Sequence, residues 1–493
     1  MKERKFFAVD LGATSGRTIV GTLTEEGLKQ EVVTRFPNRI IHACGHYYWD
    51  IYALYEEILE GLRRVAEKNV EIESIGIDTW GCDFVMIGSD GSPLRNPYSY
   101  RDPHTVGSME EFFKLCPREK LYEKTGIELM EINSLFQLST LRKNGDAAFM
   151  AAAKFLFTPD ALIYMLTGEM VCERTILSTS QLLNVHNGKI DDDLLRLLGL
   201  KASNFGRQVN PGEIVGKLSK EVQEETGLGA ISVVAVAGHD TGAAVAAIPA
   251  KDDRFAYLSC GTWSLLGIET GKPIINNRSY ELNFTNEAGV DGTTCVLKNI
   301  CGLWLLERCR VEWEGREDVP KEIGELNRNV AAAGIEVPFV NPDAKRFKNP
   351  HSMTEAISGY CRDTGQKIGD DYREIAGCIF QSLALRYRQV IEMLRDLAPL
   401  KIERLYVTGG GSQNKYLMQL TANSTGLDVV AGPKEGTAMG NLLIQAEAWG
   451  IVKDRFEMRK IVAKSTELKV YKPQEGGRWD KAYERYLKVY AED

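Results

Sequence analysis

The segment Gly238–Gly242 (G-H-D-T-G) places a charged carboxyl group within a stretch of small apolar residues. An aspartate buried in such a stretch is costly unless it has a partner or a task. One interpretation makes Asp240 or Thr241 the N-cap of a helix, because an apolar run follows. The other makes Asp240 a general base at a domain cleft, which takes the proton of a hydroxyl group as that group attacks a phosphoryl group. Both interpretations remain open, and both can hold at once.

A second segment, Asp10–Arg17 (D-L-G-A-T-S-G-R), offers a carboxylate, backbone amides, two hydroxyls and a cation within eight residues. Small residues let a backbone approach a phosphate chain closely, and amides and hydroxyls then donate to its oxygens. Asp10 is suited to hold Mg²⁺, directly or through water, because that ion favours one or two carboxylates with phosphate and water. A plain glycine-containing hairpin with a solvated aspartate is the alternative.

Two further loops are built from small residues. Ser259–Thr262 (S-C-G-T) connects two apolar runs, and Gly409–Gly411 lies between a predicted strand and a predicted helix, where nucleotides often meet helix N-termini. No G-K-[ST] follows the three glycines, so the loop is not a Walker A motif. Each loop alone is also compatible with a simple turn. Together, the loops at 10–17 and 259–262 predict a pair of phosphate clamps.

The elements that must position these loops repeat along the chain. Phe6–Val9 and Thr18–Leu23 read as two strands around the first loop, which predicts a hairpin. About 250 residues later, Phe255–Leu258 and Trp263–Ile268 surround the second loop in the same way. The repetition predicts a duplicated fold.

Helices and strands alternate elsewhere, which predicts an α/β protein with parallel or mixed sheets. Asp50 is expected to cap an amphipathic helix that starts at Ile51. Strands are expected at 74–78 and 84–87, the second closed into a hairpin by the turn at 89–92. A long helix is expected at 372–397, followed by a strand at 405–407 and a helix at 415–424.

We place the domain boundary near Val245, which gives an N-terminal domain of residues 1–245 and a C-terminal domain of residues 246–493. In this division, the last helices of the chain can pack back on the first domain. A chain of 493 residues and 55.0 kDa suits two or three domains.

Composition narrows the class of protein. With 44% hydrophobic and 26% charged residues, the chain is neither collagenous nor disordered. A net charge of -8 argues against a nucleic-acid partner. No run suits a signal peptide or a membrane span, so no membrane partner is expected. Ten cysteines without a C-x-x-C pair suggest reduced thiols and a cytoplasmic location. We expect a monomer or a small homo-oligomer.

These loops, in this order, resemble those of the FGGY family of carbohydrate kinases within the actin-like ATPase superfamily. The resemblance implies an α/β fold of two duplicated actin-like (ribonuclease H-like) domains, with ATP and sugar in the cleft between them and Mg²⁺ as a further cofactor. It also implies that residues 1–245 form the sugar-binding side and residues 246–493 the nucleotide-binding side. The matching segments span nearly the whole chain: D-L-G-A-T-S-G-R (10–17), I-D-T-W-G (77–81), G-H-D-T (238–241), L-S-C-G-T-W-S-L (258–265), G-G-G-S-Q-N (409–414) and E-G-T-A-M-G-N (435–441).

The resemblance also implies roles for single residues. Asp240 would be the proton acceptor, and Asp10 would hold Mg²⁺, through water. The sugar would be bound by Gly81, His239, Asp240, Thr241 and Asn299. The ATP phosphates would be bound by Ala13, Thr14, Ser15, Gly16, Arg17 and Thr262, with Gly409, Gly410 and Gly411 beside the adenosine.

Two positions depart from the family pattern. Family members often carry glutamine in a nucleotide contact where this chain has Glu307, which leaves that contact open. Cys260 takes the place of a serine in the second phosphate loop, and its sensitivity to oxidation is a hypothesis.

Four segments are similar to those of family members that act on L-rhamnulose: I-D-T-W-G-C-D-F (77–84), Y-R-D (100–102), H-D-T (239–241) and L-K-N-I-C-G-L-W-L-L (297–306). We therefore expect ATP-dependent phosphorylation of L-rhamnulose at its 1-hydroxyl. The alternatives are a kinase of the same family acting on L-fuculose, D-xylulose or glycerol, and an ATP-switched binding module like actin or a chaperone ATPase.

Overall fold

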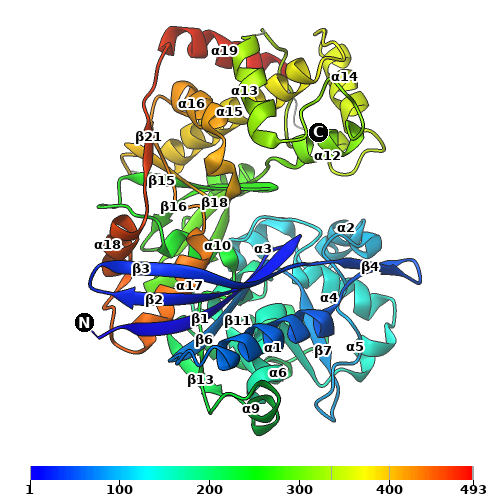
Figure 1. Ribbon diagram of the computed structural model, residues 1–493. Helices are drawn as coiled ribbons and strands as arrows, with labels where there is room; N and C mark the ends of the chain where they lie inside the picture. The colour runs from blue at the N-terminus through cyan, green and yellow to red at the C-terminus, as the bar shows by residue number, and fades with distance from the viewer. Residues whose placement is uncertain (1, 335, 399, 491–493) are drawn as a thin grey trace. The chain divides into compact units, whose positions relative to one another are not determined.

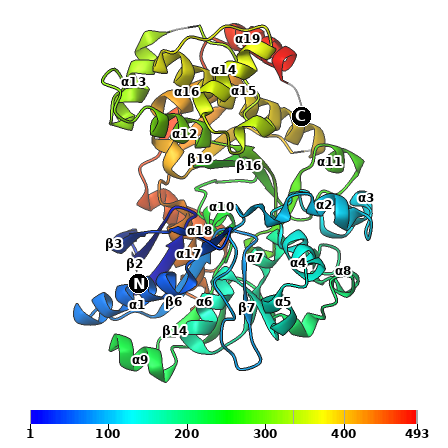
Figure 2. The same ribbon diagram turned by 90° about the vertical axis from the view of Figure 1, so that its right-hand side faces the viewer.

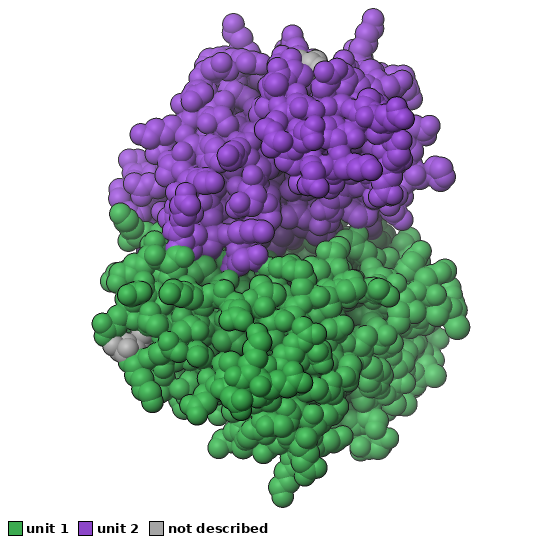
Figure 3. Space-filling model, viewed as in Figure 1, with its two compact units in different colours: residues 1–251, 269–296, 436–465 green, residues 252–268, 297–435, 466–493 purple. Residues whose placement is uncertain are grey.

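The computed structural model describes residues 2–334, 336–398 and 400–490. Within these ranges the chain forms two compact units, coloured separately in Figure 3. Unit 1 comprises the chain up to Lys251 together with Glu269–Val296 and Gly436–Ser465. Unit 2 comprises Asp252–Ile268, Leu297–Glu435 and the chain from Thr466 on. Both units are thus discontinuous in sequence, and the boundary near Val245 stays a prediction.

Unit 1 holds most of the strands and many short helices. Its strands are β1 (Arg4–Leu11), β2 (Ser15–Thr24), β3 (Gly27–Pro37), β4 (Ile40–Ala43), β5 (His46–Trp49), β6 (Ser74–Thr79), β7 (Phe84–Ile87), β8 (Lys154–Phe157), β9 (Val171–Glu173), β10 (Leu183–Asn184), β11 (Lys189–Ile190), β12 (Arg207–Val209), β13 (Glu213–Lys217), β14 (Ser232–Ala235) and β17 (Thr285–Ala288). Its helices are α1 (Ile51–Glu67), α2 (Ser108–Phe113), α3 (Arg118–Thr125), α4 (Ser134–Lys143), α5 (Ala147–Ala151), α6 (Thr158–Thr167), α7 (Arg174–Thr179), α8 (Asp192–Leu197), α9 (Lys220–Thr226), α10 (Asp240–Ala246), α11 (Asn277–Glu281), α17 (Gly436–Ala448) and α18 (Arg455–Ser465).

Unit 2 is richer in long helices. It contains β15 (Phe255–Cys260), α12 (Trp304–Glu312), α13 (Ile323–Ala333), α14 (Met353–Asp363), α15 (Tyr372–Leu397), β19 (Arg404–Thr408), the short 3-10 helix η5 (Gly410–Gln413), α16 (Lys415–Thr425), β20 (Asp428–Ala431), β21 (Lys469–Tyr471) and α19 (Gly476–Val489). The chain passes from one unit to the other within β16 (Trp263–Thr270) and β18 (Thr294–Cys301).

The sheet of unit 1 has the strand order β13-β14-β6-β1-β2-β3. The central strand β1 runs antiparallel to β2 and parallel to β6. Both of its faces are buried: Phe7, Val9 and Leu11 belong to the core on the α1 side, whereas Phe6 and Ala8 belong to the core formed with α17 (Figure 1, Figure 2). This burial explains the continuous apolar run before Asp10, because a strand covered on both faces has no polar side.

Unit 2 repeats the same strand pattern. In unit 1, β1 pairs antiparallel with β2 and parallel with β6, β6 pairs parallel with β14, and β14 pairs antiparallel with β13. In unit 2, β15 pairs antiparallel with β16 and parallel with β19, β19 pairs parallel with β20, and β20 pairs antiparallel with β21. The predicted α/β fold class, with two duplicated domains, is therefore confirmed.

Local predictions had mixed outcomes. The two hairpins are present, and Asp50 accepts a hydrogen bond from the backbone amide of Ala53 at the start of α1, as expected for an N-cap. The expected turn at 89–92 is present: the amides of Gly88 and Leu94 donate to the carbonyls of Ser92 and Met86, each at 2.9 Å, and Ile87 forms an antiparallel bridge with Pro93. The strand that pairs with the whole of β7 is nonetheless β8, which the sequence did not predict.

Two sequence-level expectations concern cysteines and membranes. All ten cysteines lie within the described ranges, and each is a free thiol. In the part of the chain that the structure describes, the helices are too short or too polar to cross a lipid bilayer.

Candidate functional site

The turn between β1 and β2 carries the first predicted phosphate loop. Its tip is closed by a bond from the amide of Gly12 to the carbonyl of Ser15, at 3.0 Å, and Thr14 and Ser15 are exposed. Gly16 is buried, and a Cβ atom there would lie 2.2 Å from the ring of Phe36. A glycine is therefore required at this position by packing. The tip, exposed at Thr14 and Ser15 and partly buried at Ala13, can present backbone amides.

Asp10 and Arg17 form an ion pair across the hairpin. They are direct partners in the β1–β2 register, and Arg17 donates to Oδ2 of Asp10 from Nη2 at 2.6 Å and from Nε at 3.1 Å. Both side chains are largely buried. The pair fixes the carboxylate of Asp10 at the end of β1 and holds a positive charge beside the loop.

A second carboxyl group, Asp78, lies directly beside Asp10 in the parallel register of β1 and β6. Its Oδ2 accepts from Nδ2 of Asn441 on α17 at 2.6 Å, and its buried Oδ1 has no hydrogen-bond partner among the described residues. Burial and the neighbouring Asp10 raise the pKa of Asp78 well above its usual range. We did not assign Asp78 or Asn441 to the site from sequence. The sequence signal that could have identified Asp78 is that β1 and β6, two buried apolar strands, each carry an aspartate near their C-terminal end.

Asp240 is the first residue of α10, and the N-cap position belongs to His239, which makes no side-chain capping bond. The interpretation of Asp240 or Thr241 as N-cap is thus wrong. The hydroxyl of Thr241 instead donates to Oδ1 of Asp240 at 3.2 Å. Burial raises the pKa of Asp240, and the nearby His239 lowers it in part. One third of the Asp240 side chain is exposed, so the carboxylate can still meet a ligand.

The backbone before Asp240 is fixed by neighbouring strands and by α7. Glu173, at the start of α7, accepts from the amide of Gly238 at 2.9 Å, and Oγ1 of Thr175 accepts from the amide of His239 at 3.1 Å. The amide of Thr79, at the end of β6, donates to the carbonyl of Gly238 at 2.9 Å. These bonds set where α10 begins.

The same short helix also positions Gly81. The amide of Cys82 donates to Oγ1 of Thr179 at 3.1 Å, and a Cβ atom at Gly81 would lie 3.2 Å from the Thr179 side chain. The indole nitrogen of Trp80 donates a hydrogen bond to Asp83 at 3.0 Å, which fixes the Trp80 ring. One helix, α7, therefore contacts both the Gly81 turn and the His239 loop through Thr179 and Thr175. It brings these two predicted sugar contacts together in unit 1.

In unit 2, the loops at 259–262 and 409–411 are packed against each other. A Cβ atom at Gly411 would lie 2.2 Å from the sulfur of Cys260, and at Gly409, where φ is 84°, it would lie 2.8 Å from the Cys260 carbonyl oxygen. A Cβ atom at Gly410 would have nothing within 4 Å. These glycines are required where the backbones approach closely, and Gly410 leaves room for a flat ligand.

Thr262 and Asn299 also lie in unit 2. Oγ1 of Thr262 donates to both carboxylate oxygens of Glu307 at 3.1 Å. Asn299 lies on β18, just before Gly302, whose Cβ would clash with the carbonyl of Gly261 at 2.7 Å. The residue that departs from the family pattern, Glu307, thus contacts a predicted phosphate-binding residue directly.

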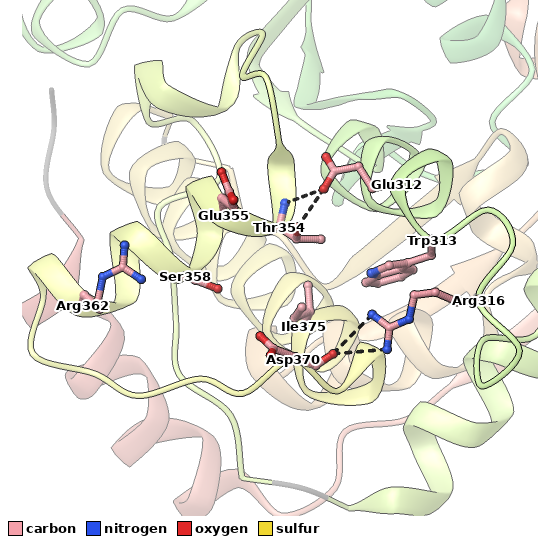
Figure 4. A pocket seen from close by; sticks show the side chains of 9 residues that line it. All are labelled: Glu312, Trp313, Arg316, Thr354, Glu355, Ser358, Arg362, Asp370 and Ile375. Atoms are coloured by element: carbon pink, nitrogen blue, oxygen red, sulfur yellow. Dashed lines mark hydrogen bonds between the residues drawn. The ribbon is translucent and has the colours of Figure 1, made fainter.

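A cavity of about 610 Å³ in unit 2 does not coincide with the predicted site (Figure 4). Glu312 accepts from the amide and hydroxyl of Thr354 at the start of α14, and Arg316 donates to the carbonyl of Asp370. These charged groups are thus engaged in holding a helix end and a loop. The described residues that line the cavity are Glu312, Trp313, Arg316, Thr354, Glu355, Ser358, Arg362, Asp370 and Ile375.

The residues of unit 1 fit a magnesium ion bound through water. Among the described residues, no three carboxylate, imidazole or thiol groups are placed to hold a metal directly. Mg²⁺ commonly keeps several waters and takes one or two carboxylates plus phosphate oxygens. Asp10 offers such a carboxylate, and a cation beside it would offset its repulsion with Asp78.

Cys260 is expected to be unreactive toward thiol reagents. It is buried, and burial raises the pKa of its thiol to about 11, so that the nucleophilic thiolate is scarce at neutral pH. Alkylation with iodoacetamide, followed by peptide mass mapping, should modify the exposed Cys44 and spare Cys260. Modification of both at equal rates would instead support the hypothesis of a redox-sensitive phosphate loop.

Family models match nearly the whole chain. Residues 6–247 match the N-terminal domain of the FGGY family of carbohydrate kinases, and residues 256–449 match the C-terminal domain of that family.

Two named relatives are similar to this chain over almost their full length. A protein of Bacteroides thetaiotaomicron named rhamnulokinase is 56% identical over 98% of this chain and 98% of its own. A Bacillus subtilis protein of the same name is 38% identical over 95% of this chain and 96% of its own.

Solved structures share the fold at low identity. A ligand-bound xylulose kinase from Lactobacillus acidophilus is similar with a TM-score of 0.79 at 16% identity, covering 99% of this chain and 97% of that one. A Plasmodium falciparum glycerol kinase with ADP has a TM-score of 0.78 at 14% identity, with the same two coverages.

Proposed function

The chain belongs to the FGGY family of carbohydrate kinases, and from this premise we propose that it transfers the γ-phosphoryl group of ATP to the 1-hydroxyl of L-rhamnulose. The products are L-rhamnulose 1-phosphate and ADP, which places the reaction in L-rhamnose catabolism. The choice of sugar rests on relatives named rhamnulokinase that match over nearly their whole length. The observation that supports the chemistry is the position of Asp240: a partly exposed carboxylate at the first residue of α10, beside His239.

In the proposed reaction, Asp240 accepts the proton of the sugar hydroxyl while the hydroxyl oxygen attacks the γ-phosphorus atom. A new bond forms between that oxygen and phosphorus, and the bond from phosphorus to the bridging oxygen of ADP breaks. The carboxylate suits this role because burial raises its pKa, which makes it a stronger base, and the nearby His239 lowers that pKa in part. Gly81, His239, Thr241 and Asn299 would contact the sugar.

The phosphate loops would hold the nucleotide. Thr14, Ser15 and the backbone from Ala13 to Gly16 are proposed to donate to phosphate oxygens, with Arg17 supplying positive charge. Thr262 would contact the phosphates, and Gly410 and Gly411 would lie beside the adenosine. Asp10 would hold Mg²⁺ through water, and the ion would supply positive charge beside the phosphates.

We propose a cytoplasmic location, which the ten free thiols support, because disulfides are rare in that compartment.

The proposal is tested by measuring ADP release with Mg-ATP against a panel of L-rhamnulose, L-fuculose, D-xylulose, D-fructose and glycerol, with a blank that lacks sugar. We expect turnover with L-rhamnulose to exceed that with every other acceptor by at least about tenfold, since a site built to bond a hydroxyl rejects analogues that lack it. Preference for another sugar would retract the substrate and keep the kinase chemistry. Hydrolysis that is independent of sugar would favour the ATP-switched module.

A further inference from the structure

Glu287 lies outside every segment that resembles the family pattern, yet it contacts the site. It is on β17 in unit 1 and is only 7% exposed. Its Oε2 lies 3.0 Å from Nδ1 of His239. A carboxylate this buried is costly unless it is paired, so the contact with His239 explains its presence.

His239 links Glu287 to Asp240. Its second ring nitrogen, Nε2, lies 3.5 Å from Oδ1 of Asp240. A neutral imidazole has one N–H group, so one of its nitrogens would turn a lone pair toward a carboxylate. Burial lowers the pKa of His239, but Glu287 and Asp240 outweigh burial and raise that pKa to about 9. His239 is therefore a cation between two carboxylates at neutral pH.

The strand that carries Glu287 is anchored on both sides of it. The amide of Ala288 donates to Oγ of Ser178 on α7 at 3.0 Å, and the amide of Asn286 donates to the carbonyl of Gly126 at 2.9 Å. Because α7 also fixes the backbone of His239 through Thr175, Glu287 and His239 are held on one common support.

We propose that Glu287 is a positioning residue for phosphoryl transfer, which holds His239 so that its imidazolium ring lies against the carboxylate of Asp240. The inference rests on the proposed role of Asp240 as proton acceptor. Glu287 acts on the reaction only through His239, and it fixes both the orientation and the charge of that ring.

The charge of His239 determines the state of Asp240. The charged groups that face His239 are Glu287 from β17, Asp240 from α10 and Glu173 from the start of α7, and Asp10 from β1 acts on Asp240. Without Glu287, the pKa of His239 falls, because burial is no longer outweighed. Wherever the ring is neutral, the pKa of Asp240 rises, because the positive charge beside it is gone. The base must be ionised to accept a proton. The low-pH side of the plot of kcat against pH, its acid limb, therefore moves to higher pH.

The test is Glu287→Gln, which keeps the size of the side chain and removes its charge. We expect the acid limb of kcat against pH, measured with Mg-ATP and L-rhamnulose, to move up by about one pH unit, so that turnover below the limb falls about tenfold. Glu287→Asp, which keeps the charge, should move the acid limb less than Glu287→Gln does. Glu128→Gln, at another buried glutamate of unit 1, should leave the limb in place.

Two readouts separate this inference from the proposed function. Histidine NMR should show that His239 titrates at lower pH in Glu287→Gln than in the parent, whether or not the enzyme turns over. In a His239→Asn background, Glu287→Gln should no longer move the acid limb, because Glu287 acts through that ring. An unchanged limb together with an unchanged His239 titration would overturn the inference. If His239 shifts but Asp240→Asn keeps full turnover, the pairing stands and the assignment of the base fails.

Discussion

Asp240→Asn is expected to lower turnover by about 10²–10⁴-fold while leaving ATP affinity nearly unchanged. Asparagine has almost the same shape as aspartate, but it cannot accept the proton of the sugar hydroxyl. The carboxylate lies at the first residue of α10 and accepts a hydrogen bond from the hydroxyl of Thr241, so the substitution leaves the backbone anchors of this loop intact. ADP release under saturating L-rhamnulose measures turnover, and nucleotide titration by calorimetry measures ATP affinity.

A matched control for Asp240→Asn is Thr241→Val, which removes the hydroxyl that donates to Asp240 and keeps the carboxylate. Loss of that bond should reduce turnover far less than loss of the base. If Asp240→Asn turned over at a rate close to that of the parent, Asp240 would not be the proton acceptor. An equal loss in both variants would point to positioning rather than proton transfer.

Gly440→Ala is expected to destabilise unit 1 strongly. α17 and α10 approach so closely that a Cβ atom at Gly440 would lie 1.9 Å from the carbonyl oxygen of Ala243. That oxygen is backbone, so no side-chain rotation relieves the clash, and the two helices must separate. Overpacking of this kind costs about 1–3 kcal/mol, and we expect the upper end because the backbone must move. Turnover should fall as well, because Asp240 is the first residue of α10.

The measurement is the midpoint of urea unfolding followed by circular dichroism, with kcat determined on the same preparation. Gly477→Ala on α19 is the control, since nothing lies within 4 Å of the added Cβ atom and alanine favours a helix over glycine by about 1 kcal/mol. It should be neutral or slightly stabilising. A Gly440→Ala protein as stable as the parent would mean that α17 can shift without cost.

The hairpins around Asp10 and Cys260 could be predicted because a continuous apolar run before a small polar loop is a local signal. The Asp50 cap and α1 could be predicted for the same reason. The partner of β7 could not, since β8 is far along the chain and only packing selects it. The membership of Gly436–Ser465 in unit 1 is equally non-local. The apolar sequence of this segment predicts a buried helix, but it does not predict which part of the protein the helix packs against.

The candidate site divides in the same way. Loops rich in glycine and hydroxyl groups are recognisable from local composition. The phosphate loops and the Asp240 segment could therefore be predicted as parts of the site. Asp78 required the register of β1 and β6, which places it beside Asp10. Asn441 and Glu287 required tertiary contacts across about 360 and about 50 residues of chain. The N-cap interpretation of Asp240 failed because His239, whose side chain faces Glu287, occupies that position.

The late position of α17 in the sequence sets an order for biosynthesis. Gln445 donates to the carbonyl of Phe7 at 3.0 Å and accepts from the hydroxyl of Ser74 at 2.8 Å, which joins a helix near the end of the chain to its first strands. As the protein emerges from the ribosome, the part of the Phe6 and Ala8 face that α17 covers stays open until most of the chain has been translated. A fragment ending at residue 247 should expose this surface and aggregate.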